Sequence, residues 1–216
     1  MHGWWVLDAW NASPLLLGAW VFWIIFSICL HELGHGWAAI RQGDPTPITS
    51  GHMTWNPFVH MGTQSLILFA LVGYYWGAMP VNPWNFRSRY GESIVAAAGP
   101  LVNLILAAFN LLCLAVAIRV MHHGSLDAAR GQNLFIFLFV GMQINLMLML
   151  FNLIPVPPLD GSRIAANLVP SYRRLLQGDH GNTFATIGFI LVFFVFGQQV
   201  NRFSSELGFR LLHAVT

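Results

Sequence analysis

One short motif constrains this chain more than its other features: His31-Glu32-Leu33-Gly34-His35, which lies inside an apolar run that begins at Leu15. On a helix, residues i and i+4 lie on the same face, so His31 and His35 can bind one zinc ion. Glu32, one position further round, can act on the metal's water as a general base. The chain contains nine His but only three Glu, so the probability of a chance match is about one in a hundred or less.

The composition places this motif in a membrane. Hydrophobic residues make up 56% of the 216 residues and charged residues 8%, against about a quarter charged in soluble domains. Two imidazoles and a carboxylate are costly to insert into an apolar helix, so such a cluster indicates a functional site. The ten Arg are scattered and Lys is absent, which excludes the clustered basic stripe of a nucleic-acid-binding protein. The lipid bilayer is therefore a predicted partner, and nucleic acid is not.

The apolar runs predict an all-α polytopic membrane protein with about four full transmembrane helices and a re-entrant segment. The re-entrant segment is 62–79, which is apolar but short and is interrupted by Gly73 and Gly77. The predicted helices run over 14–42, 92–121, 133–153 and 183–200. An interfacial lead-in (1–13), an amphipathic connection (162–182) and an interfacial tail (201–216) complete the chain. We interpret 1–216 as a single integral-membrane domain, with a core of about 14–168 and a C-terminal helix and tail of about 183–216.

A small β-strand or hairpin is predicted next to the metal-binding helix. Residues 44–61 are punctuated by proline and glycine, and the pieces Ile48-Thr49 and His52-Met53-Thr54-Trp55 between them favour extended structure. We expect the strand-like piece within 46–55 to bind an unwound substrate by strand addition.

Asp160 is the best candidate for a third metal ligand, because a catalytic zinc takes three protein ligands and keeps one position for water. It follows a helix end broken by Pro155, Pro157 and Pro158. The alternative is a turn residue in an Asp-Gly pair. The other acids that we weighed lie in flanks or loops or open a helix: Asp8, Asp127, Asp179, Glu206 and Glu92.

The pairing of Asp160 with the histidines constrains the topology. The helices 14–42 and 133–153 must run parallel, with 92–121 returning between them, so the segment 62–79 cannot cross the membrane once. Arg41 follows the apolar run of the first helix, whereas its N-terminal flank lacks Arg. The positive-inside rule therefore predicts that the active site faces the cytoplasm.

Three motifs in this order resemble the site-2 protease family of intramembrane zinc metalloproteases, peptidase family M50, in its small form without a PDZ or CBS domain. They are His31-Glu32-Leu33-Gly34-His35, Gly99-Pro100-Leu101-Val102-Asn103 and the run from Asn152 to Gly161 that contains Leu159-Asp160-Gly161. The resemblance implies one Zn2+ per chain bound by His31, His35 and Asp160, with Glu32 as the catalytic base. It also implies that Asn152 contacts the substrate or the transition state; the alternative for Asn152 is a helix–helix contact.

The predicted function is hydrolysis of peptide bonds in membrane-spanning protein substrates, as in regulated intramembrane proteolysis, by a multi-pass protein of the cell (inner or plasma) membrane. The alternatives are a polytopic metal-ion transporter and an inactive pseudoprotease that acts as a chaperone. His52 and His60 flank the motif region, and each is either an accessory ligand or gate or an ordinary solvated or hydrogen-bonded side chain.

Overall fold

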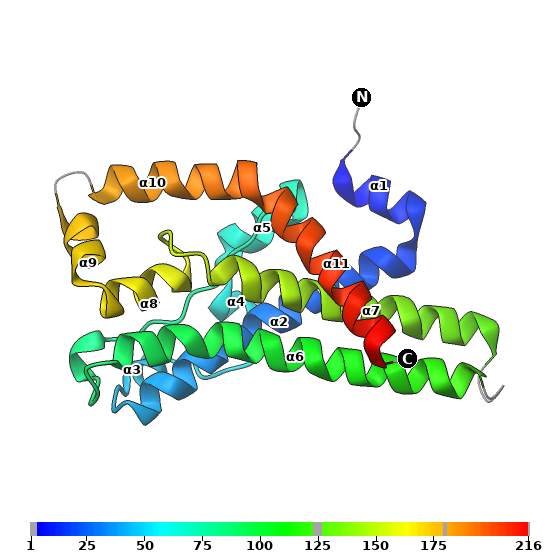
Figure 1. Ribbon diagram of the computed structural model, residues 1–216, viewed down its shortest axis with the longest axis horizontal. Helices are drawn as coiled ribbons and strands as arrows, with labels where there is room; N and C mark the ends of the chain where they lie inside the picture. Colours follow the sequence, from blue (N-terminus) through cyan, green and yellow to red (C-terminus); the bar gives the residue numbers. More distant parts are fainter. Residues whose placement is uncertain (1–3, 123–126, 179–180, 216) are drawn as a thin grey trace.

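The computed structural model describes residues 4–122, 127–178 and 181–215, and within these ranges the chain is helical with no β-strand (Figure 1). The N-terminal half contains α1 (Trp5–Ala12), α2 (Pro14–Arg41), α3 (Thr46–Thr49), α4 (Pro57–His60), α5 (Gly62–Val72) and a 3₁₀ turn at Pro83–Asn85. The C-terminal half contains α6 (Gly91–His122), α7 (Ala128–Asn152), α8 (Asp160–Leu168), α9 (Pro170–Gln177), α10 (Gly181–Leu191), a π-helical turn at Val192–Phe196 and α11 (Gly197–Val215).

Among the described residues, three helices are long and apolar enough to cross a membrane, and one bent pair of helices passes the same test together. The three are Pro14–Arg41, Gly91–Met121 and Ala129–Asn152, and the bent pair is Gly181–Val195 with Gly197–Val215. At about 1.5 Å per residue each of the three exceeds the thickness of a hydrocarbon core of about 30 Å. The prediction of an all-α membrane protein is confirmed, with the number of spans between three and four.

The three long helices alternate in direction. His31 of α2 contacts Asn103 of α6, and His35, one turn later in α2, contacts Val95, which lies earlier in α6. The helices α2 and α6 are therefore antiparallel. Contacts between α6 and α7 also run in opposite directions, and these two helices lie side by side along the length of the molecule (Figure 1). The helices α2 and α7 are therefore parallel, as predicted. A core of α2, α5 and α7 side chains fills the space around Trp23, Ile24 and Ile144.

The connection between α2 and α6 leaves and returns at the same end of the bundle. The backbone N–H of Arg87 donates to the carbonyl of Gln42 at 2.8 Å, which holds the end of the connection beside its beginning. Between these points α5 runs back toward α1, where the Trp4 indole donates to the carbonyls of Ala70 and Leu71 at 2.9 and 3.1 Å. Because α5 has eleven residues, it is too short to span alone. This path is the hairpin-like excursion predicted for 62–79.

The predicted strand or hairpin within 44–61 is wrong. Residues Thr46–Thr49 form the short helix α3, and turns and bends lead from it to α4. The cause is local: the Asp44 carboxylate accepts a hydrogen bond from the backbone N–H of Thr46, and Pro47 in the first turn has a backbone angle suited to a helix. Gly51 then has φ of +73°, which turns the chain. The proposed strand addition of substrate on 46–55 therefore loses its basis.

The C-terminal boundary also differs from the prediction. In place of one helix ending near residue 200, α10 and α11 meet at the π-helical turn with a bend of 51°, and α11 continues to Val215. A π-helical turn inserts a residue into the helical ladder and is a known cause of such bends. The segment 201–216 is therefore helical through Val215.

Candidate metal centre

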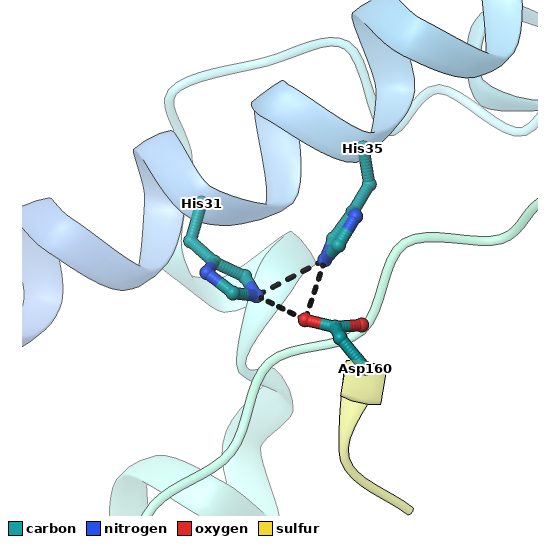
Figure 2. Close-up of side chains that lie close together, drawn as sticks. All are labelled: His31, His35 and Asp160. Carbon is teal, nitrogen blue, oxygen red and sulfur yellow. Dashed lines mark hydrogen bonds and ion pairs between the residues drawn. The ribbon is translucent and has the colours of Figure 1, made fainter. Parts of the chain in front are cut away.

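Two histidines of α2 and an aspartate at the start of α8 converge on one point (Figure 2). Asp160 Oδ2 lies 3.1 Å from His31 Nε2 and 3.3 Å from His35 Nε2, and the two imidazole Nε2 atoms are 3.0 Å apart. All three side chains are buried. Among the described residues, no other group of three or more His, Cys, Asp or Glu is spaced to hold a metal ion.

Two local structures produce this convergence. His31 and His35 are one turn apart on α2, so their rings project from the same side of the helix. After α7 ends at Asn152, residues 153–159 turn the chain so that Asp160 is the first residue of α8. Gly161 lies directly against the carbonyl of Leu153, where a Cβ would collide with the backbone, so the turn requires glycine there. The carboxylate is thereby directed back toward α2.

The outer nitrogen of each imidazole is held by a hydrogen bond. His35 Nδ1 lies 2.7 Å from the carbonyl oxygen of Val95, which can only accept, so Nδ1 carries the proton. His31 Nδ1 lies 2.7 Å from Asn103 Oδ1, and the same reasoning applies. In the neutral form of each ring, the proton on Nδ1 leaves Nε2 unprotonated and facing the centre. Such partners on the far nitrogen are typical of metal-bound histidine.

These atoms fit a zinc ion. Two imidazole nitrogens, unprotonated in the neutral rings, and a carboxylate oxygen lie within 4.8 Å of one another and can each donate an electron pair to one cation. Asp160 Oδ2 is buried, and the polar atoms that the described structure places against it are the two imidazole Nε2 atoms, at 3.1 and 3.3 Å. Two His and one carboxylate are also a common ligand set for catalytic zinc.

Glu32 lies beside this group on α2 and is buried. Within the described residues its carboxylate makes no hydrogen bond to the protein. It is covered by Gly77, where a Cβ would collide with the Glu32 carboxylate and with Ile28. The close backbone contact explains why the sequence has glycine at this position.

Gly77 belongs to an extended stretch, residues 74–82, which we call the covering segment. Ser65 Oγ holds it through both the N–H and the carbonyl of Trp76, at 2.9 and 2.8 Å, and the Ala78 N–H donates to the His60 carbonyl at 2.9 Å. At its end, the Asn82 N–H donates to Asp44 Oδ2 at 2.7 Å. These bonds fix the segment over the Glu32 face of α2.

Asp44 is a buried carboxylate that only accepts hydrogen bonds. Burial raises the pKa of Asp44, but hydrogen bonds from Thr46, Asn82 and Asn85 outweigh that effect and hold the pKa below its ordinary value. The carboxylate therefore ties the beginning of the connection to its end. Sequence analysis assigned Asp44 no part in the site.

The helices α2 and α6 meet closely at the metal centre because each has a glycine there. A Cβ on Gly99 would lie 2.5 Å from His35 Nε2 and 2.6 Å from His31 Nε2, and one on Gly34 would lie 2.8 Å from Val102. The helix α6 continues through Pro100 at this contact. Asn103, one turn beyond Gly99, faces the same site.

The other residues singled out from the sequence each make a hydrogen bond to a nearby residue of their own segment. Asn152 is the last residue of α7, and its amide donates to the Leu148 carbonyl at 3.1 Å. His52 Nδ1 lies 3.0 Å from both the carbonyl and the hydroxyl oxygen of Ser50. His60 is buried, and its Nε2 lies 2.6 Å from the Thr54 carbonyl. Neither His52 nor His60 joins the metal-binding group.

Membrane-embedded zinc metalloproteases are the class of protein that this helical fold and this donor set define. Comparison with known proteins agrees. The sequence model of Peptidase family M50 matches residues 19–120 and 114–195. The chain belongs to this family.

Individual relatives give the same result. "Putative zinc metalloprotease YwhC" of Bacillus subtilis is 39% identical over 154 residues, which are 69% of this chain and 68% of that protein. "Putative zinc metalloprotease Rip2" of Mycolicibacterium smegmatis is 32% identical over 75% of this chain and 60% of its own. "Putative zinc metalloprotease Rip2" of Mycobacterium tuberculosis is 32% identical over 80% of this chain and 64% of its own length. The chain thus matches less than two thirds of the length of each Rip2 protein. No solved structure matches.

Proposed function

We propose that this zinc metalloprotease hydrolyses peptide bonds of membrane-spanning protein substrates, with its active site toward the cytoplasmic side of the cell membrane. The convergence of Asp160 on His31 and His35, which lie next to Glu32 in the apolar helix α2, carries the proposal. A substrate that is itself in the membrane can reach a site that lies on a membrane-spanning helix.

His31 Nε2, His35 Nε2 and Asp160 Oδ2 would hold one zinc ion. When bound, zinc polarises a substrate carbonyl and lowers the pKa of water. The protein's own contribution is a rigid donor set with both tautomers fixed, in surroundings that exclude bulk water. The burial of all three donors supports this role.

Glu32 is the proposed general base. Its carboxylate accepts a proton from the attacking water as the water oxygen bonds to the peptide carbonyl carbon, and it then donates that proton to the leaving nitrogen as the C–N bond breaks. Because no group of the described residues makes a hydrogen bond to the Glu32 carboxylate, its oxygens are free for this exchange. Gly77 of the covering segment keeps the space above Glu32 narrow.

Asn152 is the proposed hydrogen-bond donor to the oxyanion. One amide hydrogen is used by the Leu148 carbonyl, and the second is available to stabilise the oxyanion of the transition state. The alternative is that Asn152 makes a helix–helix contact.

Transport of metal ions and a pseudoprotease role are the competing functions. A transport pathway needs ligands at successive depths, yet the described residues contain one candidate metal group only. A pseudoprotease would not need Glu32 beside the donors. Both observations favour the protease.

The test compares the wild type, Glu32→Gln and Glu206→Gln in detergent, measuring zinc content and cleavage of a tethered single-span substrate. Glu206 is an exposed residue of α11 and serves as a matched control. We expect one zinc in each protein, and a loss of cleavage of about 10²- to 10⁴-fold only in Glu32→Gln. Cleavage at the wild-type rate by Glu32→Gln would refute its role, and bound zinc without cleavage in all three would favour transport or a pseudoprotease.

A further inference from the structure

A chain of hydrogen bonds crosses three helices and ends at the metal centre. Asn145 Nδ2 of α7 donates to the Gly141 carbonyl at 2.9 Å, and Asn103 Nδ2 of α6 donates to Asn145 Oδ1 at 2.9 Å. Asn103 Oδ1 in turn accepts from His31 Nδ1 at 2.7 Å. Asn103 and Asn145 are completely buried, so each bond lacks competition from water.

The direction of this chain is fixed at its far end. An asparagine amide can be turned over, which exchanges its donor and acceptor, but the Gly141 carbonyl can only accept. Asn145 must therefore point its nitrogen at Gly141 and its oxygen at Asn103. This orientation directs the Asn103 nitrogen toward Asn145 and leaves the Asn103 oxygen for His31. The oxygen requires the proton on His31 Nδ1, so Nε2 is the unprotonated nitrogen of the neutral ring.

His35 reaches the same state by a different route. Its Nδ1 proton is held directly by the backbone carbonyl of Val95, which no side-chain substitution removes. The tautomer of His31 therefore depends on two side chains, whereas that of His35 depends on none. A bundle-packing role would not require this directional sequence of donors and acceptors, nor contact with the imidazole.

We propose that Asn103 and Asn145 are positioning residues for the metal centre: Asn145 orients the Asn103 amide, and Asn103 sets the tautomer and ring angle of His31. The proposal rests on the zinc site of the proposed function. Asn145 of α7 would then influence His31 of α2 without contacting it, through Asn103 of α6.

The test is zinc affinity, measured by chelator competition on purified protein, together with the melting temperature without metal. Asn103→Leu is expected to weaken zinc binding about 10- to 100-fold, and Asn145→Leu less. Because Asn145 acts through Asn103, the double variant should bind zinc no more weakly than Asn103→Leu. Asn110→Leu is the matched control: Asn110 is equally buried on α6, and its amide donates to Leu106 of its own helix, so zinc affinity should stay within about twofold.

A conservative variant separates positioning from folding. Asn103→Asp keeps an acceptor for His31 Nδ1, so it should bind zinc about tenfold more tightly than Asn103→Leu or better, even if both melt at lower temperature. Zinc affinity of Asn103→Leu within twofold of the wild type would overturn the proposal, as would additive losses in the double variant. Absence of zinc binding by the wild type would instead refute the proposed site and, with it, this inference.

Discussion

At the scale of single residues, the glycines at the helix contact decide whether the metal centre can form. Gly99 leaves room for the two imidazoles, because a Cβ there would lie within 2.6 Å of both Nε2 atoms. The space in which the proposed zinc would sit is therefore bounded on one side by backbone rather than by a side chain.

Gly99→Ala is expected to push the imidazoles apart and lower cleavage by about 100-fold, since a misplacement near 1 Å has effects of that size. Zinc content and substrate cleavage measure the effect. Gly18→Ala is the control, because Gly18 is also a helical glycine, in α2, and a Cβ added to it meets no atom within 4 Å. Unchanged zinc binding in Gly99→Ala would show that the close approach is not needed.

The sequence predicted the three donors better than the residues that orient them. The pattern His31-Glu32-Leu33-Gly34-His35 specifies its own geometry through the helical repeat. Asn103 stood in the motif Gly99-Pro100-Leu101-Val102-Asn103, but nothing in the sequence tied it to His31 rather than to another helix. The Val95 carbonyl is a backbone group, so the residue type at position 95 gives no indication that it binds His35.

At the scale of secondary-structure elements, the covering segment depends on Asp44. Its carboxylate accepts from the Thr46 N–H and hydroxyl, the Asn85 amide and the Asn82 N–H. In Asp44→Asn one acceptor oxygen becomes a donor that faces another donor. We expect a loss of stability of about 1–3 kcal/mol, measured as a lower melting temperature in detergent. Thr46→Val should cost less, since the bonds from Asn82 and Asn85 remain.

The contribution of Asp44 should also depend on pH. Because the pKa of Asp44 is lower in the folded protein than its ordinary value near 4, the folded state binds fewer protons and the stabilisation is complete above that value. It is lost as the pH falls below about 4 and through the folded pKa. The difference in melting temperature between the wild type and Asp44→Asn should shrink over that range, and a constant difference would contradict this origin.

The wrong prediction of a strand at 46–55 has its explanation at the same scale. Ile48 and Thr49 favour extended structure by residue type, but Asp44 and Pro47 start a helical turn immediately before them. A cap and a proline act on backbone hydrogen bonds and dihedral angles directly, whereas β-propensity needs a partner strand. No described segment offers one.

At the scale of the whole molecule, the direction of the helices makes the proposed orientation testable. Trp84 is 94% exposed at the end of the bundle near the metal centre, and Arg130, with a side chain 82% exposed, lies at the opposite end. In a variant lacking Cys29 and Cys113, Trp84→Cys should react with a membrane-impermeant thiol reagent only in inverted vesicles. Arg130→Cys should react only in intact cells or spheroplasts. The reverse pattern would place the active site on the outer side.

The separation of the donors along the chain has a consequence for biosynthesis. His35 and Asp160 are 125 positions apart (160 − 35), and Asp160 follows the last of the three long helices. At about 5–20 residues per second, the ribosome needs roughly 6–25 s to make this stretch. During that time the nascent chain has two imidazoles in the bilayer without their carboxylate. In the proposed site, proteolytic activity therefore begins only after α7 has been inserted, so an unfinished chain cannot cleave its neighbours at the translocon.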